Sequence, residues 1–243
     1  MNPKTNKTKT KKTDSKKATP RHMPPGSRDN DVVVVDVGGT ANAGVHSVAV
    51  AGLAAIVGAS PTSYAKAGDY GFAIAGDNGE VHAGIYGVAA AGKISKAYGG
   101  AGTFATVSDD SEAHVGDGGV ARVAGYGGTA IAGSGVAYCL HNGNAIAGTS
   151  GVALVETGKA QSGVQGIASV RWDGSARAGN GGVAIGWQNG VASAGEGGVI
   201  ILGYIDPETN KVVLKVGHMK PDGKLEPGLN YALDKKFRFV VVK

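Results

Sequence analysis

A repeat of about eight residues constrains this chain more than any other feature of its sequence. Between residues 37 and 203 the chain divides into 21 units, and 39 of its 43 glycines lie in that stretch. Clean copies are DYGFAIAG (69–76), IYGVAAAG (85–92) and HNGNAIAG (141–148). Each unit opens with turn residues, where Asp-Gly, Asn-Gly or Gly-Gly is expected to supply positive φ, and continues as an alternating, strand-like run. Such an array predicts a solenoid whose repeats contact only their neighbours.

The fifth and seventh positions of the units identify the inner surface of this fold. Of these 42 residues, 29 are Ala, seven are Val and two are Gly, and the remainder are Cys139, Ser162, Ile200 and Leu202. The fourth and sixth positions, in contrast, carry charges such as Glu80, Lys96 and Arg177. An interior lined by Ala requires two sheets closer than the ~10 Å of ordinary stacked sheets. The sequence therefore predicts an all-β fold, a narrow parallel β-solenoid held together mainly by its backbone ladders.

The outward positions alternate between polar and apolar units, so the structural period is 16 residues, with two strands per coil and about ten coils. A contiguous apolar stripe of this length exceeds what a soluble monomer normally leaves exposed. It predicts an interface for self-association into a homo-oligomer or for a protein partner. The candidate interface residues are Phe72, Ile74, Val88, Phe104, Val136, Val152, Leu154, Val183 and Ile185.

The net charge of +5 is unevenly distributed along the chain. Residues 1–30 hold nine basic and two acidic residues, whereas residues 31–203 hold seven basic and twelve acidic ones. The first segment is too poor in apolar residues to fold alone and is expected to be a disordered basic arm. Such an arm favours association with nucleic acid or an acidic surface. Its candidate contact residues are Lys4, Lys7, Lys9, Lys11, Lys12, Lys16, Lys17 and Arg21.

The first residues lack the apolar core of a secretory signal, and no apolar run is long enough to span a membrane as a helix. We therefore expect a cytoplasmic or virion-associated protein, such as a phage component, although a cell-surface component remains an alternative.

From Tyr204 the octad stops and the pattern changes to short strands separated by turns such as Pro221-Asp222-Gly223. A β-solenoid has an open end that would pair with other chains. Residues 204–243 are therefore expected to form a small C-terminal β cap. The predicted organisation is an arm (1–30), a solenoid (31–203) and a capping domain (204–243).

Two decads of the repeat, AGDYGFAIAG (67–76) and AGYGGTAIAG (124–133), resemble the Ala-Gly-Tyr-Gly-Ser-Thr-x-Thr-Ala-Gly repeat of bacterial ice-nucleation proteins. The resemblance implies 16-residue coils, outward Thr-x-Thr rows and a tyrosine ladder on one edge. This chain departs from it, because the slots that match Thr-x-Thr hold pairs such as Phe72 and Ile74. The resemblance therefore implies the fold, and ice or carbohydrate binding on a regular face is kept as an alternative function.

Enzymatic chemistry finds little support in the sequence. The Asp36-x-Gly38-Gly39-Thr40 stretch is similar to the phosphate loop of sugar kinases and actin-like ATPases, but no second nucleotide motif follows. Cys139 occupies an inward slot and is expected to be a small core residue. The Glu80/His82 and Glu112/His114 pairs lie two coils apart, about 9.6 Å, too far to share one metal ion. We therefore expect no catalytic residues, no cofactor and no metal site.

The two tryptophans form a separate feature. Trp172 and Trp187 lie nearly one coil apart in the sequence and are expected to pack along one edge of the solenoid. Contact with a sugar or a protein is the alternative.

Overall fold

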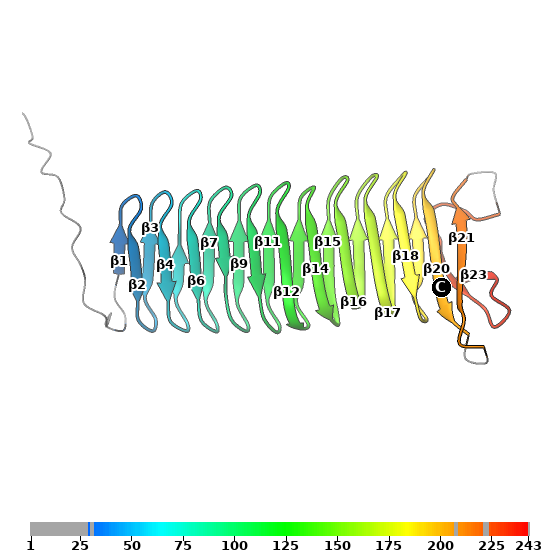
Figure 1. Cartoon of the computed structure of the whole chain (residues 1–243), viewed down its shortest axis with the longest axis horizontal. Coiled ribbons are helices and arrows are strands. Elements are labelled where there is room, and N and C mark those ends of the chain that lie inside the picture. Colours follow the sequence, from blue (N-terminus) through cyan, green and yellow to red (C-terminus); the bar gives the residue numbers. More distant parts are fainter. Residues whose placement is uncertain (1–28, 30–31, 207–208, 221–223, 243) are drawn as a thin grey trace, which may run out of the picture.

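The computed structural model describes residue 29 and residues 32–206, 209–220 and 224–242, which form a rod of stacked strands (Figure 1). The described part is an all-β, parallel solenoid of about 11 turns, and each turn of about 16 residues adds one strand to each of two sheets. The predicted fold class is confirmed. Residues 1–28 and 30 of the predicted arm, and residue 31 of the predicted solenoid, lie outside the described residues.

The first sheet, called the polar sheet here, is formed by every second strand. Its members are β1 (Val32–Val35), β3 (Val48–Ala51), β5 (Tyr64–Lys66), β7 (Glu80–Ala83), β9 (Lys96–Gly99), β11 (Glu112–Val115), β13 (Thr129–Ala132), β15 (Gly143–Ala147) and β19 (Val191–Ala194). Two long strands, β16 (Val152–Ser162) and β17 (Ile167–Ala178), contribute their second halves to this sheet.

The second sheet, called the apolar sheet here, is formed by the alternate strands. Its members are β2 (Thr40–Ala43), β4 (Ile56–Ala59), β6 (Phe72–Ala75), β8 (Val88–Ala90), β10 (Phe104–Val107), β12 (Val120–Tyr126), β14 (Val136–His141), β18 (Val183–Trp187) and β20 (Val199–Ile205). The first halves of β16 and β17 complete it.

The register between neighbouring strands repeats at 16 residues in most coils. Phe72 is paired with Val88, and Glu80 is paired with Lys96, so equivalent positions stack directly along the rod. Backbone hydrogen bonds continue this stacking beyond the strand ends, as from Phe72 N to Ala55 O (2.8 Å). The 16-residue period with two strands per coil is therefore the arrangement expected from the sequence.

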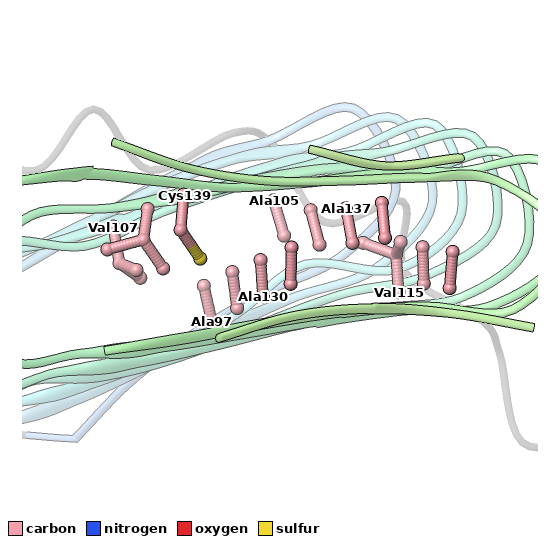
Figure 2. Packing of buried hydrophobic residues seen from close by; sticks show 14 of the residues in the cluster. Ala97, Ala105, Val107, Val115, Ala130, Ala137 and Cys139 are labelled. Atoms are coloured by element: carbon pink, nitrogen blue, oxygen red, sulfur yellow. The ribbon is translucent and has the colours of Figure 1, made fainter. Parts of the chain in front are cut away.

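The core is a thin layer of small side chains between the two sheets. Ala97 and Ala130 of the polar sheet point toward Ala105 and Ala137 of the apolar sheet (Figure 2), and all four are 0% exposed. Larger side chains such as Val107 are placed toward the ends of the layer. Because an Ala side chain buries little apolar area, each coil relies on its backbone hydrogen bonds more than an ordinary core does.

The positive φ expected of the Asn-Gly and Asp-Gly pairs is found at their first residue in pairs such as Asn78-Gly79, and turns without such a pair adopt it too. In most described turns it is adopted by a non-glycine second residue, such as Tyr70 (57°), Asn78 (55°) or Ile94 (53°). This conformation aims the backbone N–H of that residue at the next coil, as from Asn78 N to Lys93 O (2.8 Å). The glycine that follows is required for space, since a Cβ at Gly79 would lie 2.7 Å from the Cβ of Ala75.

This geometry makes Ile94 a strained position. A β-branched residue with positive φ costs about 1–2 kcal/mol, and Ile94 is 66% exposed, so little packing offsets that cost. We expect Ile94→Asn to raise the free energy of unfolding by about 1 kcal/mol. The reciprocal change Asn78→Ile, at the same turn position one coil earlier, should lower it by a similar amount. Urea unfolding of both variants checks this, and equal midpoints would contradict it.

Two kinds of polar side chain tie neighbouring coils together at the turns. Asp69 Oδ1 accepts a hydrogen bond from Ile85 N (2.8 Å), and Asp77 Oδ1 accepts one from Lys93 N (2.8 Å), in each case from the next coil. A buried serine column does the same inside the fold, where Ser111 Oγ accepts from Ser95 N (3.0 Å). The turn acids, which look sporadic in the sequence, thus satisfy backbone donors of the following coil.

The C-terminal strands, called the cap here, pair with the last strands of both sheets. Strand β21 (Val212–His218) pairs antiparallel with β20, and β22 (Asn230–Leu233) pairs with β19 and with β23 (Phe239–Val242). Met219 and Tyr231 are almost fully buried, and Met219 N donates to Gly198 O in the last coil (2.9 Å). The end of the core is thereby covered by strands of opposite direction, as Figure 1 shows at the C-terminal end.

Candidate interaction surfaces

The outward residues of the apolar sheet form two parallel columns, and together they are called the apolar face here. The first column is aliphatic or aromatic in every coil from β4 to β20. Its members are Ile56, Phe72, Val88, Phe104, Val120, Val136, Val152, Ile167, Val183 and Val199. Their side chains are exposed or half-buried, and Phe72 is 49% exposed. The structure therefore places a continuous apolar ridge along most of the rod.

The second column of the apolar face is less uniform. It contains the predicted residues Ile74, Leu154 and Ile185, but Arg122 and Tyr138 interrupt it near the middle of the rod. All nine predicted interface residues thus lie on one face, and the outermost two strands that carry them, β6 and β18, are seven coils apart. Their role as an interface stays a prediction, because burial within a single chain does not test it.

The apolar face continues onto the cap, which the sequence analysis did not foresee. The register of β21 sets Val216 beside Ile201 and Leu214 beside Gly203, so both point outward with the apolar face. Val216 is 56% exposed and Leu214 is 53% exposed. The alternating pattern of β21 is visible in the sequence, but the strand with which it pairs cannot be predicted from it.

The outward residues of the polar sheet form a mixed-charge ladder in the middle of the rod. Glu80, Lys96 and Glu112 stack in one column, and Lys96 Nζ lies 3.4 Å from Glu112 Oε2. The rings of His82 and Tyr98 stack beside them with centroids 4.8 Å apart. Glu112 raises the pKa of Lys96, as expected for an adjacent carboxylate. Exposed pairs of this kind contribute little to stability and mainly favour one register.

One edge of the solenoid carries aromatic and charged side chains on successive coils. Tyr126 and His141 stack at 4.8 Å, and His141 Nδ1 lies 3.6 Å from Glu156 Oε2. Arg171 Nη1 lies 3.7 Å from the other oxygen of Glu156, and its guanidinium lies over the ring of Trp172 at 5.3 Å. The sequence spacing of His141 gave no sign of a carboxylate neighbour, because the contact joins two coils.

Cys139 lies in the core of the solenoid. Cys139 is fully buried, its Sγ donates to Asn144 O (3.2 Å), and burial raises the pKa of the thiol to about 11. It is a core residue with little thiolate near neutral pH. Within the described ranges, no three His, Cys, Asp or Glu side chains are placed to hold a metal ion.

A helix able to cross a bilayer is not found among the residues that the structure describes. The basic residues predicted for anionic contact, from Lys4 to Arg21, lie outside the described residues. No protein-family model, curated protein or solved structure matches this chain. A function is therefore proposed from the surfaces of the described part of the chain.

Proposed function

We propose that this chain is a non-enzymatic structural protein, a rigid β-solenoid that self-associates through its apolar face. The observation that carries the proposal is the unbroken first column of that face, which stays apolar over ten successive coils. Isolated apolar residues are common on protein surfaces, but a ridge of this length is typical of a surface that another molecule covers.

A second copy is the occupant that fits this ridge best. The ridge repeats at the ~4.8 Å spacing of stacked strands, so a second copy presents side chains at the same spacing. Two such faces can interdigitate as the sheets of a β-sandwich do. A different protein partner, in a phage particle or at a cell surface, is the alternative within this proposal.

The other functions that the sequence left open receive less support. Association with nucleic acid or an acidic surface depends on the basic arm, whose residues up to 28 lie outside the described part of the structure. Ice binding as in the ice-nucleation repeat depends on outward Thr-x-Thr rows, and the equivalent slots here hold Phe72 and Ile74. Both stay predictions, as does the absence of enzymatic activity.

Lysine substitutions on opposite faces test the proposal. Phe72→Lys with Phe104→Lys places two charges on the ridge and should weaken self-association at least about 100-fold, because buried aromatic anchors each contribute about 2 kcal/mol. The matched control, Tyr64→Lys with Tyr98→Lys, removes two rings from the polar sheet and adds the same charge. Sedimentation velocity should show dissociation of the first variant only. Equal behaviour of the two variants would sink the assignment of the interface to the apolar face.

A further inference from the structure

A hollow at one edge of the solenoid lies beside the apolar ridge, and the second column of the apolar face contributes Ser169 to its lining. It is formed where β17, β18 and β20 leave the apolar sheet, and its volume is about 400 Å³. This volume is within the ~300–1,000 Å³ of small-molecule sites. The hollow is lined by Ser169, Arg171, Trp172, Trp187, Gln188 and Ile205.

The two indoles are placed by the register of successive coils. Val170 is paired with Gly186, so Arg171 and Trp187 follow at equivalent positions, and Trp172 lies one residue further along β17. Both tryptophans line the hollow. Asp173 N donates to Gln188 O (3.2 Å), which continues the pairing past the strands. Asn189 Nδ2 donates to Asp173 Oδ1 (3.0 Å) and ties the two turns together.

Gly203 makes room for the indole of Trp187. A Cβ at Gly203 would lie 2.6 Å from Cε3 and 2.8 Å from Cδ2 of that ring. These distances are too short for a Cβ atom, so any other residue at position 203 would displace the ring. The ring therefore lies against the backbone of the next coil. The site thus contains the indole of Trp187, which packs on Gly203, and the indole of Trp172 one coil away. Trp172 has 38% of its surface exposed.

The charges around the hollow nearly cancel. The guanidinium of Arg171 lies over the ring of Trp172 and near Glu156, at 3.7 Å. Glu156 also contacts His141, and Asp173 lies on the neighbouring turn. Such surroundings disfavour an anionic strand, whose binding requires an excess of positive charge. They suit a neutral ligand that offers hydrogen-bonding groups and a flat apolar face.

We propose that this hollow binds a neutral saccharide. The C–H face of a pyranose ring packs on an indole, and the ring's hydroxyls can pair with the amide of Gln188 and the hydroxyl of Ser169. The ligand class is a neutral oligosaccharide, because the hollow is open toward solvent along the edge and places two aromatic rings on successive coils. Binding there would attach the rod to a glycan independently of its apolar ridge.

The chain carries its own reporter for this proposal, since its only two tryptophans both line the hollow. The emission of the full-length protein is titrated with maltohexaose, cellohexaose and chitohexaose, each up to about 10 mM. We expect at least one of them to change the emission with a Kd on the order of 0.1 to 1 mM. Calorimetry with that sugar should show Trp172→Ala and Gln188→Ala each weakening binding about tenfold.

The matched control is Tyr126→Ala, which removes an exposed aromatic ring from the same edge, away from the hollow. Its Kd should equal that of the unmodified chain. The proposal is overturned if none of the three sugars changes the emission, or if Trp172→Ala binds as well as the control. A salt-sensitive emission change with a dT12 oligonucleotide, in the absence of any response to the sugars, would assign the hollow to nucleic acid instead. The outcome is independent of self-association, because the Phe72/Phe104 lysine variant keeps the hollow intact.

Discussion

Replacing Ala105 by leucine is expected to lower the free energy of unfolding by more than about 3 kcal/mol, with loss of the folded rod as the extreme result. Ala105 is 0% exposed and points from the apolar sheet toward the polar sheet (Figure 2). Its neighbours in the stack, Ala89 and Ala121, are equally buried. A core built from large side chains can repack around a new isobutyl group. Here the distance between the two sheets is set by the methyl groups of alanines on both sides, which leaves no room for it.

The control for this prediction is Thr106→Leu, which introduces the same side chain one residue further along β10. Thr106 points outward and is half-buried, so a leucine there should change the free energy of unfolding by no more than about 0.5 kcal/mol. Urea denaturation followed by circular dichroism compares the two variants. If Ala105→Leu unfolded at the same urea concentration as Thr106→Leu, the tight alanine interior would be refuted.

The second large effect is expected at the cap, where Met219→Lys should detach the C-terminal strands and cause aggregation. Met219 is 0% exposed beside the last coil, so a lysine there would place an unpaired charge at the end of the core. Detachment would uncover Ile200 and Leu202 together with the free edge of β20. An open β edge of this kind pairs with other chains. Turbidity on warming and thioflavin binding measure the result.

The matched substitution is His218→Lys, which adds a lysine at the exposed neighbouring position. It should leave the thermal midpoint and the onset of turbidity close to those of the unmodified chain. Aggregation of both variants to the same extent would show that added charge, rather than loss of the cap, is responsible.

The architecture could be predicted because the same pattern of inward, outward and turn residues recurs in every repeat unit. The inward positions exclude charge in all units, and the alternation of polar and apolar outward pairs reveals two strands per coil. The turns were predicted less well, since the positive φ was assigned to dipeptides such as Asn78-Gly79 without saying which of the two residues adopts it. In the structure Asn78 adopts it, because its N–H must reach the next coil, while Gly79 avoids a clash.

The candidate surfaces were predictable to the extent that they follow the repeat. The residues of the apolar ridge recur every 16 positions, whereas its extension to Leu214 and Val216 depends on an antiparallel pairing that no repeat encodes. At the edge hollow, the sequence offered contact with a sugar or a protein only as the alternative to packing of the two tryptophans, for a similar reason. Trp172 and Trp187 are visible in the sequence, but Glu156 and Gly203 belong to neighbouring coils and become their neighbours only through the register.

The mass of the unmodified chain in solution tests the central claim most directly. Sedimentation equilibrium between about 1 and 100 μM covers the affinities expected of a covered apolar face. The account predicts a species of at least twice 24.1 kDa that gives way to the single chain on dilution or in the Phe72/Phe104 lysine variant. A mass of 24.1 kDa at every concentration would contradict self-association through the apolar face.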